Sequence, residues 1–413
     1  MPLGEQSLHL CIGLSCNGKD RVSGVGRVST ALSKQPMSSV LRKLLPKYLQ
    51  GSGSHADLES TWAQQDALPP CVPADSLLTE TRVGPYEVLR RLGDGEFSTV
   101  VECRAGAAPE TYALKVIGKA KVLRPSSVVK SIRNIGRVNR EVKAMRAANH
   151  AGICRLFDVM QTPSHIYLVL EKGDRDLYAL IDDYPGGCPE TVVKSATRVL
   201  VLALRHCHNA KIAHRDIKPE NILVCGDPQT WHQNPDAGIV KLCDFGLCAD
   251  IPEDGGLLSD FVGSPGFFAP ELLQRPAYDG ARADLFSLGA VMVELIFGHD
   301  FFGAVWYPAY ESFLQVDSFA AALAEALVRV RCGPADKPPA APPLQALLNG
   351  LLEVPALSGN QIEGAKCVDA TYIRTCICAM AWRLHAIDAT LTRCPCDRAG
   401  SMAWRLTKDN AIP

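Results

Sequence analysis

Two glycines and a lysine are the first residues whose types and spacing suggest chemistry. Gly93 and Gly95 stand two residues apart after the alternating stretch Tyr86–Leu92, and Lys115 interrupts the apolar residues of a later strand-like stretch. Because glycine lacks a Cβ, backbone amides at such a turn can approach a polyphosphate closely. The pattern alone is weak, since a Gly-x-Gly turn usually belongs to an ordinary hairpin and a lysine in a strand usually faces solvent.

Short motifs farther along the chain are more specific as an ordered set. The string HRDIKPEN occupies positions 214–221, DFG occupies 244–246, APE occupies 269–271, and Asp284 is followed by Ser287 and Gly289. Together with the glycine-rich turn and the Ala-Leu-Lys string ending at Lys115, this set resembles a eukaryotic serine/threonine protein kinase domain. The resemblance covers roughly residues 84–410.

The resemblance implies a role for each polar residue of these motifs. Lys115 would hold the α- and β-phosphates of ATP, Asp216 would be the catalytic base, and Lys218 would neutralise the γ-phosphate. Asn221 and Asp244 would bind two Mg²⁺ ions, which prefer oxygen ligands. These assignments suit phosphoryl transfer, because that reaction depends on positioning and charge neutralisation.

Lys115 requires an anionic partner, and the next helix offers one. Apolar residues recur there at three- and four-residue steps, as expected for the buried face of a helix, at Val128, Ile132, Ile135, Val138, Val142 and Met145. Glu141 is the best match to the glutamate that related kinases carry on this helix, because the residue one turn earlier is the cation Arg137. The long gap between Lys115 and Glu141 predicts an insertion near 121–131.

Residues from both lobes would enclose the nucleotide, by the same resemblance. Val100 and Ala113 would cover one face of the adenine ring, and Leu223 would cover the other. Leu170 would stand at the back of the pocket, and the backbone of the connecting segment would meet the adenine edge. The further residues assigned to nucleotide binding are Leu92, Gly93, Gly95, Ser98, Glu171, Gly173, Asp176 and Glu220.

The acceptor is expected to be a serine or threonine of a protein. Lys218 within the catalytic motif indicates this by resemblance, and Ser264 would help to hold Lys218. Asp176, Glu220 and Glu294 stand where kinases that prefer basic substrates carry acids, and their carboxylates could pair with arginine upstream of the acceptor. The alternative is that Asp176 binds the ribose and the two glutamates are structural.

The segment before Ser264 predicts a regulatory contact. Arg215 precedes the catalytic Asp216, which is typical of kinases whose activation loop is ordered by an anion on this arginine. Asp260 lies where relatives often carry a phosphorylated threonine, so it is a candidate partial substitute for the phosphate. A carboxylate carries less charge and fewer oxygens than a phosphate, and phosphorylation of Ser259 therefore stays open.

The expected fold class is α+β, the bilobal protein kinase fold. The N-lobe (84–171) should hold a five-stranded antiparallel sheet and one major helix, and the C-lobe (172–410) should be mainly helical. An atypical insertion is expected at about 300–366, including an amphipathic helix at Phe313–Val330 and an exposed stretch rich in Pro and Ala. Glu271 is expected to pair with Arg398, with Arg393 as the rival. Residues 1–83 are expected to form a disordered leader and linker.

Composition excludes several other classes of protein. The 413 residues hold 43 Lys and Arg against 44 Asp and Glu, so bulk binding to nucleic acid is not expected. No apolar run has the length of a membrane span. The 16 cysteines contain no CxxC pair and are interpreted mainly as reduced core thiols. A cytoplasmic location is expected, although the basic, serine-rich start leaves organelle targeting open.

Three functions fit these motifs to different degrees. The favoured one is ATP·Mg²⁺-dependent phosphorylation of proteins, with a motif style similar to the calcium/calmodulin-dependent-kinase-like branch. A pseudokinase scaffold that binds partners through its C-lobe is disfavoured by the intact polar residues. A small-molecule kinase is disfavoured by the complete segment that ends at Glu271. The sequence does not indicate an oligomeric state.

Overall fold

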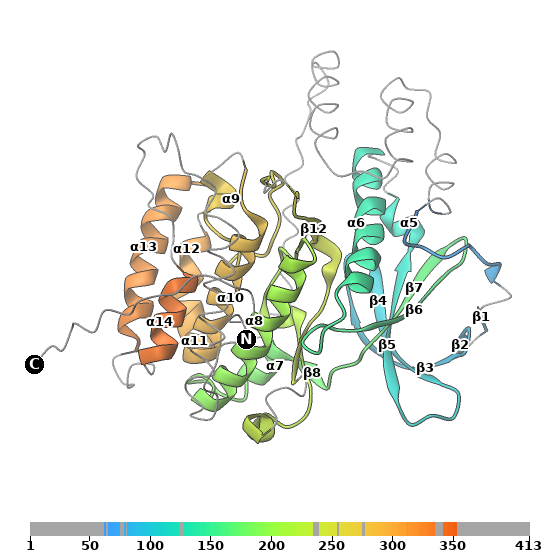
Figure 1. Ribbon diagram of the computed structural model, residues 1–413, viewed down its shortest axis with the longest axis horizontal. Helices are drawn as coiled ribbons and strands as arrows, with labels where there is room; N and C mark the ends of the chain where they lie inside the picture. The colour runs from blue at the N-terminus through green and yellow to red at the C-terminus, as the bar shows by residue number, and fades with distance from the viewer. Residues whose placement is uncertain are drawn as a thin grey trace, which may run out of the picture.

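Two lobes lie side by side in the computed structural model, with β-strands in one and mostly helices in the other (Figure 1). The structure describes residues 62, 65–74, 78–79, 81–123, 128–233, 239–253, 256–274, 277–311, 313–334 and 342–352. The segment after β7 connects the lobes (Figure 1). This arrangement confirms the predicted fold class.

The N-lobe is built on one antiparallel sheet in the order β1-β2-β3-β4-β5-β7-β6. Its long strands are β3 (Tyr86–Asp94), β4 (Ser98–Ala105), β5 (Thr111–Gly118), β6 (Leu156–Gln161) and β7 (His165–Leu170). These are the five predicted strands. Two short strands, β1 (Leu78–Thr79) and β2 (Arg82–Val83), extend the sheet beyond β3.

The predicted major helix is α6 (Val128–Ala147), which follows the short helix α5 (Lys119–Val122). Its apolar face carries Ile135, Val138 and Val142, all buried in one cluster with residues of β5, β6 and β7. The three- and four-residue spacing puts these side chains on one side of the helix, where they pack against the sheet. Part of the predicted insertion before this helix, residues 124–127, lies outside the described residues.

The C-lobe is a set of packed helices around a single hydrophobic core. Its longer helices are α8 (Glu190–Asn209), α10 (Gly280–Phe297), α13 (Val316–Cys332) and α14 (Pro342–Leu351). Shorter ones are α7 (Leu177–Ile181), α9 (Glu271–Gln274), α11 (His299–Phe301), the π-helix η5 (Phe302–Trp306) and α12 (Pro308–Glu311). The apolar residues of α10 are buried almost throughout, so it forms the centre of this lobe.

Small strands and short 3₁₀ helices lie between residues 175 and 250, on either side of the predicted catalytic motifs. The strands are β8 (Arg175–Asp176), β9 (Ile212–Ala213), β10 (Ile222–Val224), β11 (Val240–Leu242) and β12 (Ala249–Asp250). The 3₁₀ turns are η2 (Pro219–Asn221), η3 (Pro228–Gln233) and η4 (Phe245–Leu247). Strands β8, β10 and β11 form one sheet, and β9 pairs with β12. These pairings hold the loops that carry the predicted catalytic motifs.

Part of the predicted disordered leader is folded, which corrects that prediction. Trp62 and Ala67 are buried against the N-lobe, because their apolar side chains join the cluster that includes α6. The predicted amphipathic helix in the insertion is present as α13, and α11, η5, α12 and α14 flank it. Arg393 and Arg398, and with them the expected ion pair of Glu271, lie outside the described residues.

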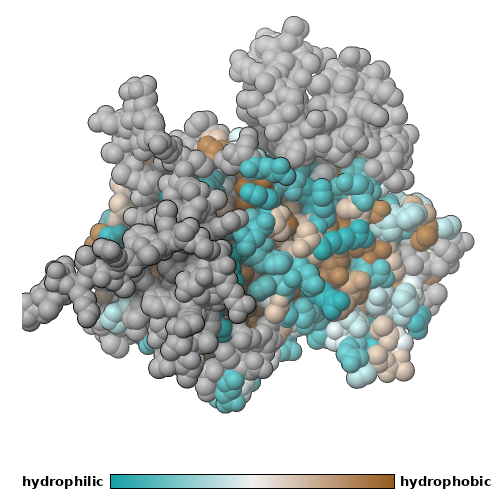
Figure 2. Space-filling view, in the orientation of Figure 1, coloured by the Kyte–Doolittle hydropathy of each residue, from teal (hydrophilic) through white to brown (hydrophobic). Residues whose placement is uncertain are grey.

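Other features of the described part agree with the composition. Helices long and apolar enough to cross a bilayer are absent from it. All nine of its cysteines are free thiols. Figure 2 shows hydrophilic and hydrophobic residues interleaved over the face of the N-lobe in view. None of these observations indicates a membrane span or a disulfide framework in the described part.

Candidate active site

A buried carboxylate on α10 shapes the loop that carries Asp216. Asp284 accepts hydrogen bonds from the backbone N–H of His214 at 2.8 Å and of Arg215 at 2.7 Å. The same carboxylate lies 2.9 Å from Nε2 of His208. Arg215 has a left-handed backbone with φ of 69°, which is costly for a residue with a long side chain. The two bonds from Asp284 hold the loop in this conformation and thereby aim Asp216 toward the cleft.

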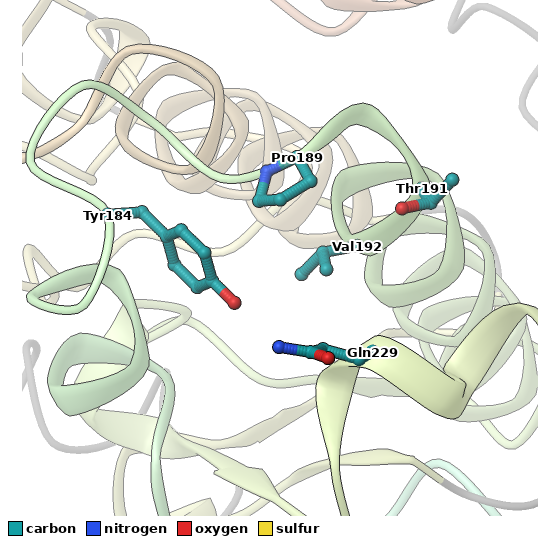
Figure 3. A pocket seen from close by; sticks show the side chains of 5 residues that line it. All are labelled: Tyr184, Pro189, Thr191, Val192 and Gln229. Carbon is teal, nitrogen blue, oxygen red and sulfur yellow. The ribbon is translucent and has the colours of Figure 1, made fainter.

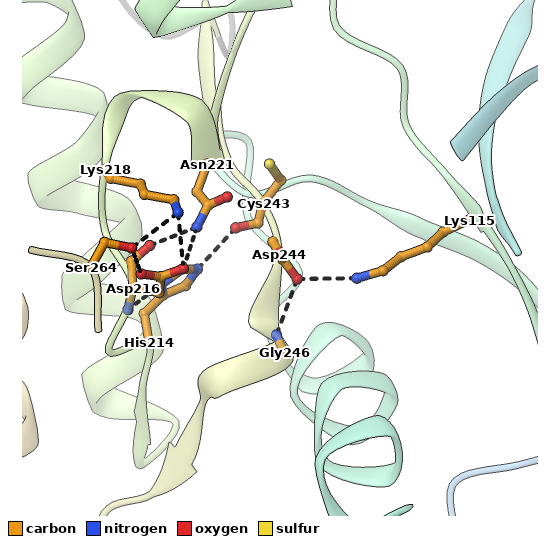
Figure 4. A network of polar contacts seen from close by, with 9 residues as sticks. All are labelled: Lys115, His214, Asp216, Lys218, Asn221, Cys243, Asp244, Gly246 and Ser264. Carbon is orange, nitrogen blue, oxygen red and sulfur yellow. Dashed lines mark hydrogen bonds and ion pairs between the residues drawn. The ribbon is translucent and has the colours of Figure 1, made fainter. Parts of the chain in front are cut away.

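Asp216 is surrounded by three side chains that bind or face its carboxylate (Figure 4). Ser264 donates from Oγ to Oδ1 at 2.7 Å, and Asn221 donates from Nδ2 to Oδ2 at 2.9 Å. Lys218 donates to Ser264 Oγ at 3.0 Å, and its Nζ lies 3.7 Å from Asp216 Oδ2. These contacts fix the orientation of the Asp216 carboxylate while leaving it partly exposed. Such an anchored carboxylate can orient a hydroxyl group and accept its proton.

Lys115 connects the sheet, α6 and the loop that follows β11. Its Nζ lies 2.6 Å from Oε1 of Glu141 and 3.1 Å from Oδ1 of Asp244. Burial alone would lower the pKa of Lys115, but the two carboxylates outweigh it and raise the pKa. The charge of Lys115 lowers the pKa of Asp244 to about 2. Burial raises the pKa of the Glu141 carboxyl group, and the charge of Lys115 opposes that rise. The geometry places the Lys115 ammonium between two carboxyl groups.

The loop of Asp244 is held in an unusual backbone conformation. Asp244 has φ of 58° and ψ of 76°, and its carboxylate accepts a hydrogen bond from the N–H of Gly246 at 3.3 Å. The next residue, Phe245, is fully buried and its ring lies 4.8 Å from that of His214. His214 also contacts the carbonyl oxygen of Cys243 at 3.0 Å. The buried ring of Phe245 thus ties the position of Asp244 to the catalytic loop.

Asn221 and Asp244 offer donor atoms that suit Mg²⁺. Asn221 uses its Nδ2 to bond Asp216, so its carbonyl oxygen Oδ1 is the atom suited to a cation. Mg²⁺ is commonly bound through one or two protein oxygen groups together with substrate phosphates and waters. Clusters of three or more His, Cys, Asp or Glu that suit a metal are absent among the described residues. The donor set therefore fits a nucleotide-associated ion.

The predicted nucleotide-binding residues of the N-lobe lie on paired strands of one sheet. Gly93 pairs with Val100, and Ala113 pairs with Leu170 in the N-lobe sheet. Gly95 lies at the turn between β3 and β4, and a Cβ there would come within 2.8 Å of Ser98 Oγ. This turn leaves little room for any side chain at that glycine. Leu92 is exposed near the end of β3.

The lower side of the predicted nucleotide site comes from the C-lobe. Leu223 pairs with Asp176 in the sheet formed by β8 and β10. A Cβ on Gly173 would lie 2.8 Å from the Cβ of Leu223, so only glycine fits there without a shift. Glu171 is held by Lys241 at 3.1 Å, and its backbone N–H donates to the carbonyl of Arg155 at 2.9 Å. The connecting segment is thus fixed at Glu171.

The three predicted substrate acids have different environments. Glu220 is exposed, whereas Asp176 caps α7 by accepting the N–H of Ala179 at 2.8 Å. Glu294 is buried and lies 2.7 Å from Nδ1 of His299, a partner that the sequence motifs did not indicate. Burial raises the pKa of Tyr178, and the charges of all three acids and of Asp182 raise it further. The acids therefore gather around Tyr178, with Glu220 the most accessible of the predicted three.

The predicted regulatory residues meet beside the catalytic loop. Arg215 Nη1 lies 3.1 Å from Oδ2 of Asp260, and the same guanidinium donates to Tyr278 Oη and to the carbonyl of Leu247. Burial alone would raise the pKa of Asp260, but the charge and hydrogen bond of Arg215 lower it. Ser259 is exposed. Tyr278, which donates to the backbone carbonyl of Asp260 at 3.0 Å, was missed because no motif marks it.

A separate hollow lies on the C-lobe surface (Figure 3). It has a volume of about 320 Å³ and is lined by Tyr184, Pro189, Thr191, Val192 and Gln229. These residues come from the segment before α8, from α8 itself and from η3. Since none of them belongs to the predicted site, the hollow is distinct from the proposed chemistry.

Comparisons with known proteins agree with this geometry. A family model described as the protein kinase domain matches residues 86–340. CBL-interacting protein kinase 4 of Oryza sativa subsp. japonica is 40% identical over 224 residues, which cover 53% of this chain and 46% of that protein. CBL-interacting serine/threonine-protein kinase 19 of Arabidopsis thaliana is 36% identical over 220 residues, covering 52% and 41%.

A fungal protein is also similar. Sucrose non-fermenting protein kinase 1 of Fusarium virguliforme is 34% identical over 231 residues, which cover 55% of this chain and 30% of that protein. The chain thus spans less than half the length of each of these three relatives. Their names fit the serine/threonine type and the branch that the motif style indicated.

Proposed function

The chain belongs to the protein kinase family, and from that premise we propose that it transfers the γ-phosphoryl group of ATP to serine and threonine hydroxyls of proteins. The observation that carries this proposal is the anchored carboxylate of Asp216, which lies among Ser264, Asn221 and Lys218. The catalytic unit is proposed to span about residues 84–410, with the lobes meeting at residues 171–172.

In the proposed reaction, Asp216 orients the acceptor hydroxyl and accepts its proton. The hydroxyl oxygen forms a bond to the γ-phosphorus, the bond to the β-phosphate oxygen breaks, and ADP leaves. Lys218, which lies near Asp216, neutralises the γ-phosphate during transfer, and Lys115 holds the α- and β-phosphates. Asn221 and Asp244 would hold Mg²⁺ through their side-chain oxygens, and the ion would supply positive charge against the phosphates.

The Lys115–Glu141 pair supports the nucleotide-binding part of the proposal. At 2.6 Å the pair is well formed, and it fixes the cation on β5 at the edge of the cleft. Adenine would lie between Val100 and Ala113 of the N-lobe and Leu223 of the C-lobe. Asp260 against Arg215 supports the proposal that the activation segment can be ordered without phosphorylation.

We propose that substrates carry arginine upstream of the acceptor. Glu220 is the favoured partner because it is exposed, while Asp176 and Glu294 already accept hydrogen bonds from the protein. The shared influence of these acids on Tyr178 supports an electronegative surface beside the catalytic loop.

The test is phosphate incorporation from ATP·Mg²⁺ into a degenerate peptide library by the full-length chain. The proposal predicts label on serine and threonine, little on tyrosine, and enrichment of arginine before the acceptor. Glu220→Gln should weaken that enrichment by up to about fivefold, because an exposed charge pair contributes roughly 0.2–1 kcal/mol. Label confined to tyrosine, or absent altogether, would contradict the proposed acceptor class.

A further inference from the structure

A short N-terminal segment packs against the N-lobe ahead of the first strand. Trp62 and residues 65–73, called the strap below, begin the coloured chain beside α5 in Figure 1. Trp62 is only 2% exposed and Ala67 only 6%. Both belong to one hydrophobic cluster with Ile117 of β5 and with Ile135, Val138 and Val142 of α6. The strap therefore adds apolar surface to the contact between α6 and the sheet.

Polar contacts attach the strap to α6 at two points. Asn139 accepts the N–H of Ala67 at 3.2 Å and donates to the carboxylate of Asp66 at 2.7 Å. Arg146 donates from Nη1 to the carbonyl of Ala67 at 2.7 Å. Seven residues separate Asn139 from Arg146, which is about two turns of helix. The strap thus contacts one face of α6 over about two turns.

Further contacts attach the strap to the sheet. Gln161 at the end of β6 donates from its side-chain Nε2 to the carbonyl of Pro69. The backbone carbonyl of Gln161 accepts the N–H of Val72 at 3.0 Å. Lys119, which follows β5, is buried and donates to Gln161 Oε1 at 2.8 Å. Its Nζ also lies 5.6 Å from the ring centre of Trp62, within the range of a cation–π contact. The strap therefore joins α6 to the strand β6 and to the end of β5.

The same two elements carry the ion pair of the proposed site. Glu141 lies on α6 between Asn139 and Val142, and Lys115 lies on β5 two residues before Ile117. A 2.6 Å contact between Lys115 and Glu141 requires α6 to keep its position relative to β5. Phosphoryl transfer is sensitive to such positioning, since a displacement of about 1 Å can reduce the rate by roughly a hundredfold.

We propose that the strap positions α6 for catalysis, so that Trp62 and the two polar attachments keep Glu141 against Lys115. Trp62 and Asn139 are positioning residues, because they contact neither nucleotide nor acceptor in the proposed site. This inference rests on the proposed kinase activity. It makes an N-terminal segment of the chain itself an activating element.

The test compares full-length variants in the peptide assay and by hydrogen exchange. Trp62→Ala leaves a cavity in the hydrophobic cluster that Trp62 shares with α6. Asn139→Ala removes the hydrogen bonds of Asn139 to Asp66 and Ala67 without changing the apolar core. Both should lower kcat about tenfold or more, leave the KM for peptide within about twofold, and speed amide exchange in residues 128–147. Val72→Ala is the matched control, because this strap side chain is exposed while its backbone bond remains.

A conservative variant separates positioning from general folding. Trp62→Phe keeps an aromatic ring and removes an indole N–H that is buried without a hydrogen-bond partner among the described residues. It should retain most of the kcat and the slow exchange of α6. If Trp62→Ala melts below the assay temperature, Asn139→Ala decides the question.

Two outcomes overturn the inference. One is an active wild-type chain whose kcat stays unchanged in Asn139→Ala and in folded Trp62→Ala. The other is unchanged exchange in α6 in both variants. An inactive wild-type chain would instead refute the proposed kinase activity, and hydrogen exchange would still report whether the strap holds α6.

Discussion

At the scale of single residues, the proposed chemistry depends on ionised groups held at short distances. Lys115 lies between Glu141 and Asp244, and the low pKa of Asp244 keeps its carboxylate charged. Asp216 is oriented by donors instead of a strong cation, since Lys218 Nζ stands 3.7 Å away. Asp244 is thus held in its charged form, and Asp216 is the carboxylate that we propose accepts the proton.

Asp260 provides a prediction at this scale. Its carboxylate is the acidic partner of Arg215, whose side chain is only 3% exposed. Asp260→Asn should lower the activity of the unphosphorylated chain severalfold, because a buried guanidinium without its anionic partner is destabilised. The measurement is kcat on a peptide after phosphatase treatment.

Glu253→Gln is the control for that experiment, because Glu253 is an exposed acid of the same segment. Its kcat should match that of the wild type. Turnover by Asp260→Asn equal to that of the wild type would show that Asp260 does not substitute for a phosphate on Arg215.

At the scale of elements, the site is assembled where helices meet the loops of the cleft. Asp284 on α10 fixes the catalytic loop, and Glu141 on α6 fixes the lysine of β5. His299 joins two further elements, because it contacts Glu294 of α10 at 2.7 Å and the carbonyl of Tyr178 in α7 at 3.1 Å. Its Nε2 also lies 3.5 Å from Asp182.

His299 gives a prediction about pH. Burial alone would lower its pKa, but the hydrogen bond and charge of Glu294 raise it above the ordinary value of 6.5. Protonated His299 should therefore stabilise the fold fully below the ordinary pKa, and this contribution should disappear as pH rises through the folded-state pKa. The wild type should exceed His299→Gln in free energy of unfolding by roughly 1.5–3 kcal/mol at low pH.

Denaturant unfolding of both proteins, from about pH 5 to about pH 9, measures this difference in the free energy of unfolding. The gap between the two proteins should shrink as the pH increases. A gap that stays constant, or widens, with rising pH would show that His299 is not held in its protonated form by Glu294.

The sequence predicted the parts of the site that local spacing determines. Asp216, Lys218 and Asn221 lie within six residues of one another, so one motif places them close together, while the contacts with Asp284 set the conformation of their loop. Glu141 could be found because it matches the glutamate that related kinases carry on this helix. Alternation at Tyr86–Leu92 predicted β3, and an amphipathic pattern predicted α13, although the bounds of α13 shifted by two or three residues.

Contacts between residues distant in the chain could not be predicted in this way. Asn139 contacts Asp66 across 73 positions, and the pattern of residues 51–80 is that of a linker. Their composition is rich in small and polar residues, and a single buried tryptophan leaves no periodic signal. The pairing of Glu294 with His299 was missed for a different reason, since only the folded chain shows that Glu294 is buried.

At the scale of the whole molecule, a net charge near zero coexists with a cluster of charged residues at the proposed site. The chain has a formal net charge of −1, yet the cation of Lys115 lies against Asp244 and that of Lys218 lies near Asp216. These groups come from both lobes, so neither lobe alone contains the proposed site. The strap adds a third contributor, because it holds the N-lobe helix that completes the lysine pair.

We propose that Asp216 accepts the proton of the acceptor hydroxyl. The initial rate of γ-phosphate transfer from ATP·Mg²⁺ to a serine peptide tests this role. Asp216→Asn should retain nucleotide binding but lose at least about a hundredfold in kcat, as expected when a positioned general base is removed. Asp317→Asn, at an exposed acid of α13, is the control and should match the wild type. Equal rates for the wild type and Asp216→Asn, whether both high or both at background, would contradict the proposed role of Asp216 in phosphoryl transfer.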